Sequence, residues 1–148
     1  MERDYDYSSA VFETDLDAAD AVGKNAAKRT LERLGASKAK TGKFPVIYDR
    51  RVAASLVSTL AGAINGASVA RGTSFLKDQL GKKIAADGLN FIDDALRPRG
   101  MGSRPVDAEG CPVQNRKMVE DGVLQGWFLD LSSAAKLGLA SMGNAKRS

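Results

Sequence analysis

The chain has 148 residues, 43% of them hydrophobic, which is ordinary for one water-soluble globular domain. It has no apolar run of about eighteen residues and no apolar N-terminal stretch, which disfavours a membrane span and a secretory signal, and its single cysteine fits a reducing cytoplasm. The net charge of +4 is spread along the chain without interleaved aromatic residues, a pattern that disfavours nucleic-acid binding.

The first predicted element is a helix that follows an irregular N-terminus. Thr14 and Asp17 have the spacing of a capping box, in which the first side chain accepts an N–H of the first helical turn. Apolar residues then recur at three- and four-residue steps as far as Leu34. Gly35 can end this helix because glycine adopts the left-handed conformation without strain. The polar segment 36–43 that follows is predicted to be a linker between two structural units.

A short strand and a long helix are predicted next. The apolar run Phe44–Tyr48 indicates a strand, and Asp49 can cap a helix that reaches about Ser68. Gly62 and Gly66 each weaken a helix by about 1 kcal/mol relative to alanine. The sequence therefore predicts that another segment packs closely against this helix.

The second half of the chain predicts loops and antiparallel strands. Residues 84–93 indicate a strand interrupted at Asp87-Gly88, and the Gly-, Pro- and Arg-rich segment 97–110 is typical of a loop. The Asp-Gly pair at 121–122 lies between two β-rich runs, 113–119 and 123–129, which favours a hairpin. A short helix is then expected over 133–137, capped by Ser132 and ended by Gly138. This order of elements predicts an α+β fold.

Few residues offer catalytic chemistry, because the sequence contains no histidine. This excludes Ser-His and Cys-His pairs and a His-ligated zinc ion. Ser74 and Ser133 each stand three residues before a lysine, the spacing of Ser-x-x-Lys, but the other motifs of that enzyme class are not in place. Surface or capping roles are therefore predicted for both serines.

Two carboxylate pairs and the cysteine are the remaining candidates. Asp93-Asp94 and Asp107/Glu109 lack the spacing of a metal-binding loop, so solvated loop carboxylates are expected. Cys111 has no histidine to serve as its base, and a small, partly buried core cysteine is predicted.

Two stretches of the chain resemble the TldD/PmbA metalloprotease family. The first begins at Phe44 and contains LAGAINGASVARGTSFLKDQLG. The second contains Asp107-Ala-Glu-Gly110, the hairpin around Asp121-Gly122 and Ala135-Lys-Leu-Gly138, in the family's order. The resemblance implies that residues 1–40 are the end of an N-terminal domain and a linker. Residues 41–148 would then form part of a C-terminal domain, with helices packed on an antiparallel, partly barrel-like sheet, in a fragment of a longer protein.

The resemblance also implies a role. The active TldD subunit of this family carries His-Glu-x-x-x-His on the corresponding helix, where two histidines can bind a metal and the glutamate can activate its water. The matching positions here are Leu60, Ala61 and Asn65, which lack that chemistry. The resemblance therefore implies a TldE (PmbA)-like subunit with no catalytic, metal or cofactor residues of its own. Its expected partner is a zinc-bearing, TldD-like subunit, in a cytoplasmic heterodimer that cleaves unfolded peptides.

A surface for the partner or the peptide is predicted at Asn65, Arg71 and Ser74. The family's common label, "modulator of DNA gyrase", implies no DNA-binding site. As a fragment, the chain is expected to expose apolar surface and an unpaired strand edge. Two alternatives remain: a stand-alone peptide-binding or scaffolding module without catalysis, and a hydrolase that uses Ser74 or Cys111.

Overall fold

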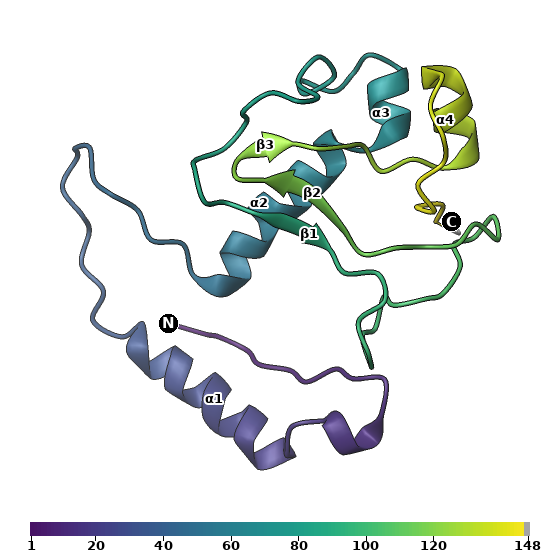
Figure 1. Ribbon diagram of the computed structural model, residues 1–148. Coiled ribbons are helices and arrows are strands. Elements are labelled where there is room, and N and C mark those ends of the chain that lie inside the picture. Colours follow the sequence, from purple (N-terminus) through teal and green to yellow (C-terminus); the bar gives the residue numbers. More distant parts are fainter. Residues whose placement is uncertain (147–148) are drawn as a thin grey trace. The chain divides into compact units, whose positions relative to one another are not determined.

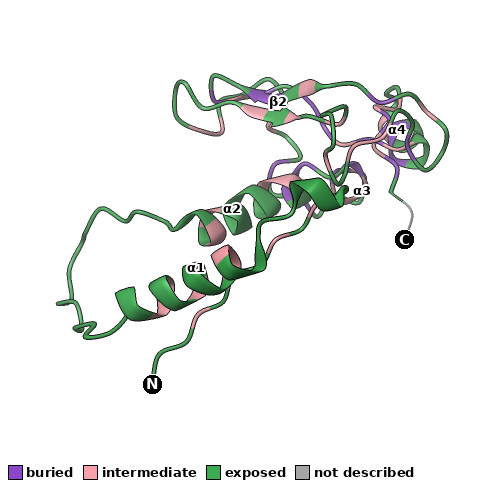
Figure 2. Cartoon of the chain, turned by 90° about the horizontal axis from the view of Figure 1, so that it is seen from below, coloured by how far each residue is buried: buried purple, intermediate pink, exposed green. Residues whose placement is uncertain are grey.

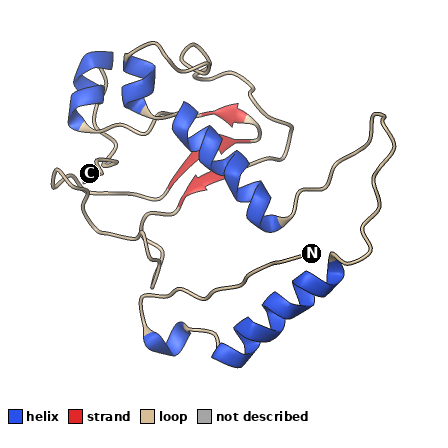
Figure 3. Cartoon of the chain, turned by 180° about the vertical axis from the view of Figure 1, so that it is seen from behind, coloured by secondary structure: helices blue, strands red, loops and turns tan. Residues whose placement is uncertain are grey.

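The computed structural model describes residues 1–146, which divide into two compact units. Unit 1 contains residues 1–46 and 99–101, and unit 2 contains the remainder of the described chain. The elements, in chain order, are η1 (Glu13–Asp15), α1 (Ala19–Glu32), α2 (Arg50–Ala63), α3 (Gly66–Ala70), β1 (Phe91–Asp93), β2 (Arg116–Glu120), β3 (Val123–Leu124) and α4 (Leu131–Leu137) (Figures 1 and 3). None of the helices in the described residues combines the length and the apolar character that crossing a membrane requires.

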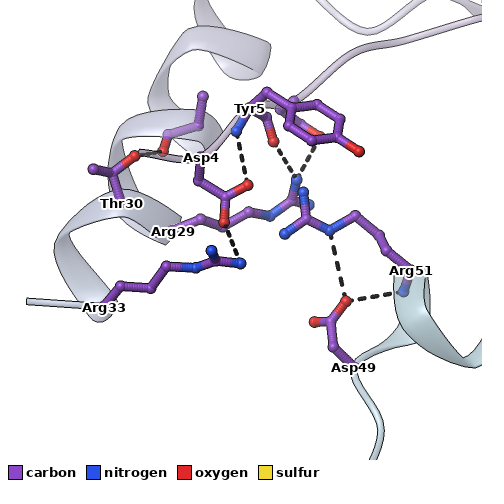
Figure 4. Close-up of polar contacts among 9 residues, drawn as sticks. Asp4, Tyr5, Arg29, Thr30, Arg33, Asp49 and Arg51 are labelled. Atoms are coloured by element: carbon purple, nitrogen blue, oxygen red, sulfur yellow. Dashed lines mark hydrogen bonds and ion pairs between the residues drawn. The ribbon is translucent and has the colours of Figure 1, made fainter. Parts of the chain in front are cut away.

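Unit 1 is built from α1 and the extended segment before it. Arg33 pairs with Asp4 at 3.0 Å (Figure 4). Arg29 pairs with Asp6 at 2.6 Å. Two residues of extended chain span about 6.6 Å and four helical residues about 6 Å, so alternate side chains of the segment meet successive turns of the helix. The hydrogen bond from Arg29 holds the pKa of Asp6 below its usual value.

The predicted start of α1 was wrong, whereas the predicted end before Gly35 is close to the observed end at Glu32. The helix begins at Ala19 after Ala18, which provides no side-chain cap, and Thr14 instead lies in η1. There the Thr14 hydroxyl accepts a hydrogen bond from Arg99 at 3.0 Å. Gly35 lies just beyond the helix with a φ of +73°, as predicted.

The predicted strand Phe44–Tyr48 is also wrong, because these residues form neither a helix nor a strand. Ile47 is 99% exposed, and Pro45 has no N–H to offer a neighbouring strand. The next prediction is confirmed: the Asp49 side chain caps α2 by accepting the N–H of Arg51 at 2.9 Å (Figure 4).

The sheet has three antiparallel strands in the order β1-β2-β3. The predicted hairpin is confirmed, with Val119 opposite Leu124 and positive φ angles at Asp121 (47°) and Gly122 (77°). Such a pair of left-handed residues is what a two-residue hairpin turn requires. The strands are shorter than predicted, and β1 covers only the end of the segment 84–93.

The core of unit 2 lies between this sheet and the helices α3 and α4. Its four most deeply buried large side chains are Ile64, Met118, Val119 and Leu124. Trp127 and Leu129 are also buried, whereas Phe128 between them is only half-buried, which matches the alternation of an extended chain. Figure 2 shows that burial is concentrated in this half of the chain. The predicted α+β class is confirmed.

The last helix, α4, is capped by Asp130 and not by Ser132 as predicted. The Asp130 carboxylate accepts the N–H of Ser133 at 2.6 Å, and the Ser133 hydroxyl completes a capping box. Gly138 ends the helix with a φ of +66°, as predicted.

The predicted exposed apolar surface is present on α2. Val52 and Leu56 on this helix are 52% and 53% exposed. Only the last turn of α2 contacts the core, through Leu60 and Ala63.

Candidate functional site

The three positions that match the family's metal motif lie where α2 ends. Leu60 and Ala61 are in the last turn of α2, and Asn65 lies between α2 and α3. Leu60 packs against the apolar core, and Asn65 is exposed. The prediction of one helix reaching about Ser68 is therefore wrong, because the helix is interrupted at residues 64–65.

Asn65 starts a new helix instead of continuing the old one. Its backbone is extended, and its Oδ1 accepts the N–H groups of Ala67 at 3.1 Å and Ser68 at 3.3 Å. Asparagine is among the best N-cap residues, and Asn-Gly is a strong turn signal. The pair at 65–66 was thus the signal that sequence reasoning missed.

The interruption allows the chain to pair with Phe128. The N–H of Phe128 donates to the carbonyl oxygen of Ile64 at 2.9 Å, and the N–H of Gly66 donates to the carbonyl oxygen of Phe128 at 2.8 Å. These two bonds make a parallel bridge between residues 65 and 128. The bridge joins the end of α2 to the extended segment that leads into α4.

Gly66 is the small residue that this contact requires. A Cβ built on Gly66 would lie 2.6 Å from a Leu129 methyl carbon and 2.7 Å from the carbonyl oxygen of Phe128. A Cβ on Gly62 would meet nothing within 4 Å. The predicted close approach is confirmed at Gly66 but not at Gly62.

The buried side chain of Ser74 helps to hold the end of α2 in place. It is only 6% exposed, and its hydroxyl donates to the carbonyl oxygen of Ala63 at 2.5 Å and accepts the N–H of Leu76 at 3.0 Å. Ser74 therefore cannot belong to the exposed partner surface predicted for it. Asn65 and Arg71 are exposed, and their role at such a surface stays a prediction.

Ser133 is likewise buried and bonded, with its hydroxyl 2.6 Å from Asp130 Oδ1. The predicted capping role is confirmed for Ser133, which completes the capping box of α4. Ser74 caps no helix and instead holds a turn by accepting the N–H of Leu76, and a surface role is wrong for both serines. Neither hydroxyl is placed as a nucleophile.

The residues at the end of α2 do not fit a metal ion. The Leu60 side chain is apolar and packs against the core, Ala61 has no donor atom, and Asn65 Oδ1 already accepts two N–H groups. A metal site needs lone pairs that converge on one point. These three positions offer none.

One other group in the described residues brings possible ligand atoms together, namely Asp107, Glu109 and Cys111, within 4.8 Å. The Asp107 carboxylate is occupied by backbone donors: Oδ1 accepts from Glu109 and Cys111, and Oδ2 accepts from Ala145, each at 2.9 Å. Asp107 is 6% exposed, so the prediction of a solvated carboxylate was wrong here. The group organises a loop, and Cys111 is partly buried as predicted.

The carboxyl group of Asp107 makes stability depend on pH. Burial raises its pKa, but the N–H groups of Ala145, Cys111 and Glu109 outweigh burial and hold the pKa below its ordinary value. A lowered folded-state pKa stabilises the fold above the unfolded-state pKa of about 3.9, and that contribution is lost as the pH falls through the folded-state pKa. We expect the urea midpoint to fall between about pH 5 and pH 2.

Asp107→Asn removes this titration, so its urea midpoint should fall less over the same pH range. Asp94→Asn changes an exposed carboxylate and should retain the wild-type slope. Equal slopes for wild type and Asp107→Asn would contradict the assignment.

A family model described as the PmbA/TldA metallopeptidase C-terminal domain matches residues 41–148. Metalloprotease PmbA from Escherichia coli O157:H7 is 43% identical over 145 residues, which cover 98% of this chain and 32% of that protein. The chain thus spans about a third of the length of this relative.

Two solved structures are also similar. A protein from Bacteroides thetaiotaomicron VPI-5482, described as a modulator of DNA gyrase, has a TM-score of 0.85 and 30% identity, covering 94% of this chain and 32% of its own. TldE from Thermococcus kodakarensis has a TM-score of 0.56 and 30% identity, covering 60% of this chain and 20% of its own.

Proposed function

Because the chain belongs to the PmbA/TldD metallopeptidase family, we propose that it is a TldE (PmbA)-like component, without a metal site, of a TldD/TldE-type metalloprotease complex. The catalytic zinc ion is held by a TldD-like partner, and the complex cleaves unfolded peptides in the cytoplasm. Residues 1–40 are the end of an N-terminal domain and its linker, and residues 41–148 are part of the C-terminal domain.

The observation that carries this proposal is the end of α2. The positions that hold the metal ligands and the acid of a TldD-like subunit are occupied by Leu60, Ala61 and Asn65. Leu60 packs against the core and Asn65 caps α3. Leu60 and Asn65 therefore have structural roles, and Ala61 has no side-chain atom that could bind a metal. In the proposed complex, the metal ligands would come from the partner and not from this chain.

The proposal is tested by mixing the chain with a TldD-like protein that carries His-Glu-x-x-x-His. We expect the two to co-purify, and hydrolysis of an unfolded peptide to occur only in the mixture and to stop on addition of a chelator. Cleavage by the chain alone in the presence of a chelator would contradict the proposal.

Surface variants locate the contact. Arg71→Glu reverses a charge at the exposed end of α3, next to the proposed surface, and should weaken association about tenfold. Lys136→Glu makes the same change on an exposed position of α4 and should leave association unchanged. Equal effects of the two variants would count against a partner surface at Asn65 and Arg71.

The second candidate function is a stand-alone peptide-binding or scaffolding module, which the exposed apolar face of α2 favours. Peptide binding without any association with a TldD-like protein would support it. The hydrolase alternative is disfavoured, because the Ser74 hydroxyl is buried and bonded and Cys111 has no histidine beside it.

A further inference from the structure

The tip of the loop between β1 and β2 is held by the side chain of Arg99. Residues 99–101 belong to unit 1, whereas residues 98 and 102 belong to unit 2. The Arg99 guanidinium makes three contacts with residues in and next to η1. Its Nε lies 2.7 Å from Asp15 Oδ2, its Nη2 donates to Thr14 Oγ1 at 3.0 Å, and its Cζ lies 4.4 Å from the centre of the Phe12 ring.

The backbone of Arg99 is strained. Its φ of +59° lies in the left-handed region, which favours glycine and disfavours a residue with a Cβ. Among the described residues, the other non-glycine residue with a positive φ is Asp121, which the hairpin turn explains. A strained backbone persists where the surrounding contacts hold it. The three side-chain contacts therefore keep the tip of the loop in this conformation.

The contacts and the strain are of similar size. The side chains of Arg99 and Asp15 are 51% and 37% exposed, so their ion pair is of the weak, solvent-exposed kind. Such an ion pair, a cation–π contact and a hydrogen bond each favour the closed loop by up to about fivefold. A left-handed residue other than glycine disfavours it by about five- to thirtyfold. The closed loop is thus favoured by only about tenfold, and an open form is populated.

We propose that residues 99–101 form a reversible latch on residues 12–15, and that its opening exposes the Arg99–Gly100 peptide bond to proteolysis. Of the three arginines in this loop, Arg97 and Arg104 each precede a proline, and bonds to proline resist cleavage. A protease that is specific for arginine binds the arginine side chain in a pocket. The Arg99 side chain is occupied while the latch is closed, so the bond after it is cut only in the open form. This latch is independent of the proposed function.

The test measures the initial rate at which an arginine-specific protease cuts the 148-residue chain after Arg99, with the products identified by mass spectrometry. When opening and closing are fast relative to cleavage, this rate follows the fraction of open loop. Asp15→Asn removes the ion pair without changing the cleaved sequence and should raise the rate about fourfold. Phe12→Leu removes the ring that faces the guanidinium and should raise the rate by a similar factor.

Asp17→Asn is the matched control, because it removes the same charge two residues further along the chain. Asp17 is exposed, and its backbone N–H, which the variant retains, donates to Ser8 at 2.9 Å, so this variant should be cut at the wild-type rate. Salt screens an exposed ion pair, so high salt should speed cleavage of the wild type more than that of Asp15→Asn. Circular dichroism checks that the variants fold, and if Phe12→Leu does not fold, the Asp15→Asn rate decides.

Two results would overturn the proposal: an unchanged rate of cleavage after Arg99 in a folded Asp15→Asn variant, or an equal increase of that rate in Asp17→Asn. The first would show that the ion pair does not hold the loop. The second would show that the protease responds to the charge of the segment and not to the latch. Because the assay needs no partner and no activity of the chain, neither result bears on the proposed function.

Discussion

Gly66→Ala is expected to destabilise unit 2 by about 3 kcal/mol, the upper end of the usual cost of overpacking. The added Cβ would lie 2.6 Å from Leu129 Cδ2, 2.7 Å from the carbonyl oxygen of Phe128 and 2.8 Å from Ser133 Oγ. The Phe128 oxygen is backbone and is bonded to Gly66 itself, so it cannot move away without losing the bridge. Urea unfolding followed by tryptophan emission measures the loss.

Gly62→Ala is the matched control, because it makes the same change four residues earlier on α2. A Cβ there meets nothing within 4 Å, so only helix propensity changes, and a gain of up to about 1 kcal/mol is expected. The two variants should therefore shift the free energy of unfolding in opposite directions. A neutral or stabilising Gly66→Ala would show that the contact between residues 66 and 128 is looser than described.

Ile64→Ala is expected to cost about 2–5 kcal/mol, the range for removing a buried aliphatic side chain. Ile64 is 0% exposed and stands at the interruption between α2 and α3, so its loss leaves a cavity beneath the bridge to Phe128. Ile47→Ala makes the same change at a position that is 99% exposed and should stay within about 0.5 kcal/mol of wild type. Similar losses for the two variants would contradict the assigned core.

The features predicted correctly from sequence are those fixed by a few neighbouring residues. Asp49 caps α2, Asp121-Gly122 turns the hairpin and Gly138 ends α4, since each depends on local backbone conformation or one nearby bond. The end of α2 was mispredicted because its conformation is set by pairing with Phe128, far along the chain. The Asn-Gly pair at 65–66 favours a turn there, whereas the continuous apolar period favours a helix. The pairing with Phe128 decided between them.

The candidate site could be predicted only in part. The resemblance identified Leu60, Ala61 and Asn65, and the structure adds that Leu60 is packed and Asn65 is a cap. The burial of Ser74 could not be predicted, because it depends on where the carbonyl oxygen of Ala63 lies after folding.

The zinc content of the purified chain and of its complex tests most directly whether this chain is the metal-free component of a zinc-dependent complex. Both are dialysed against dilute zinc and analysed for metal per polypeptide. We expect substoichiometric zinc in the isolated chain and about one zinc ion per complex, lost when the histidines of the TldD-like partner are replaced. Stoichiometric zinc in the isolated chain, or zinc retained by the complex after that replacement, would contradict the claim.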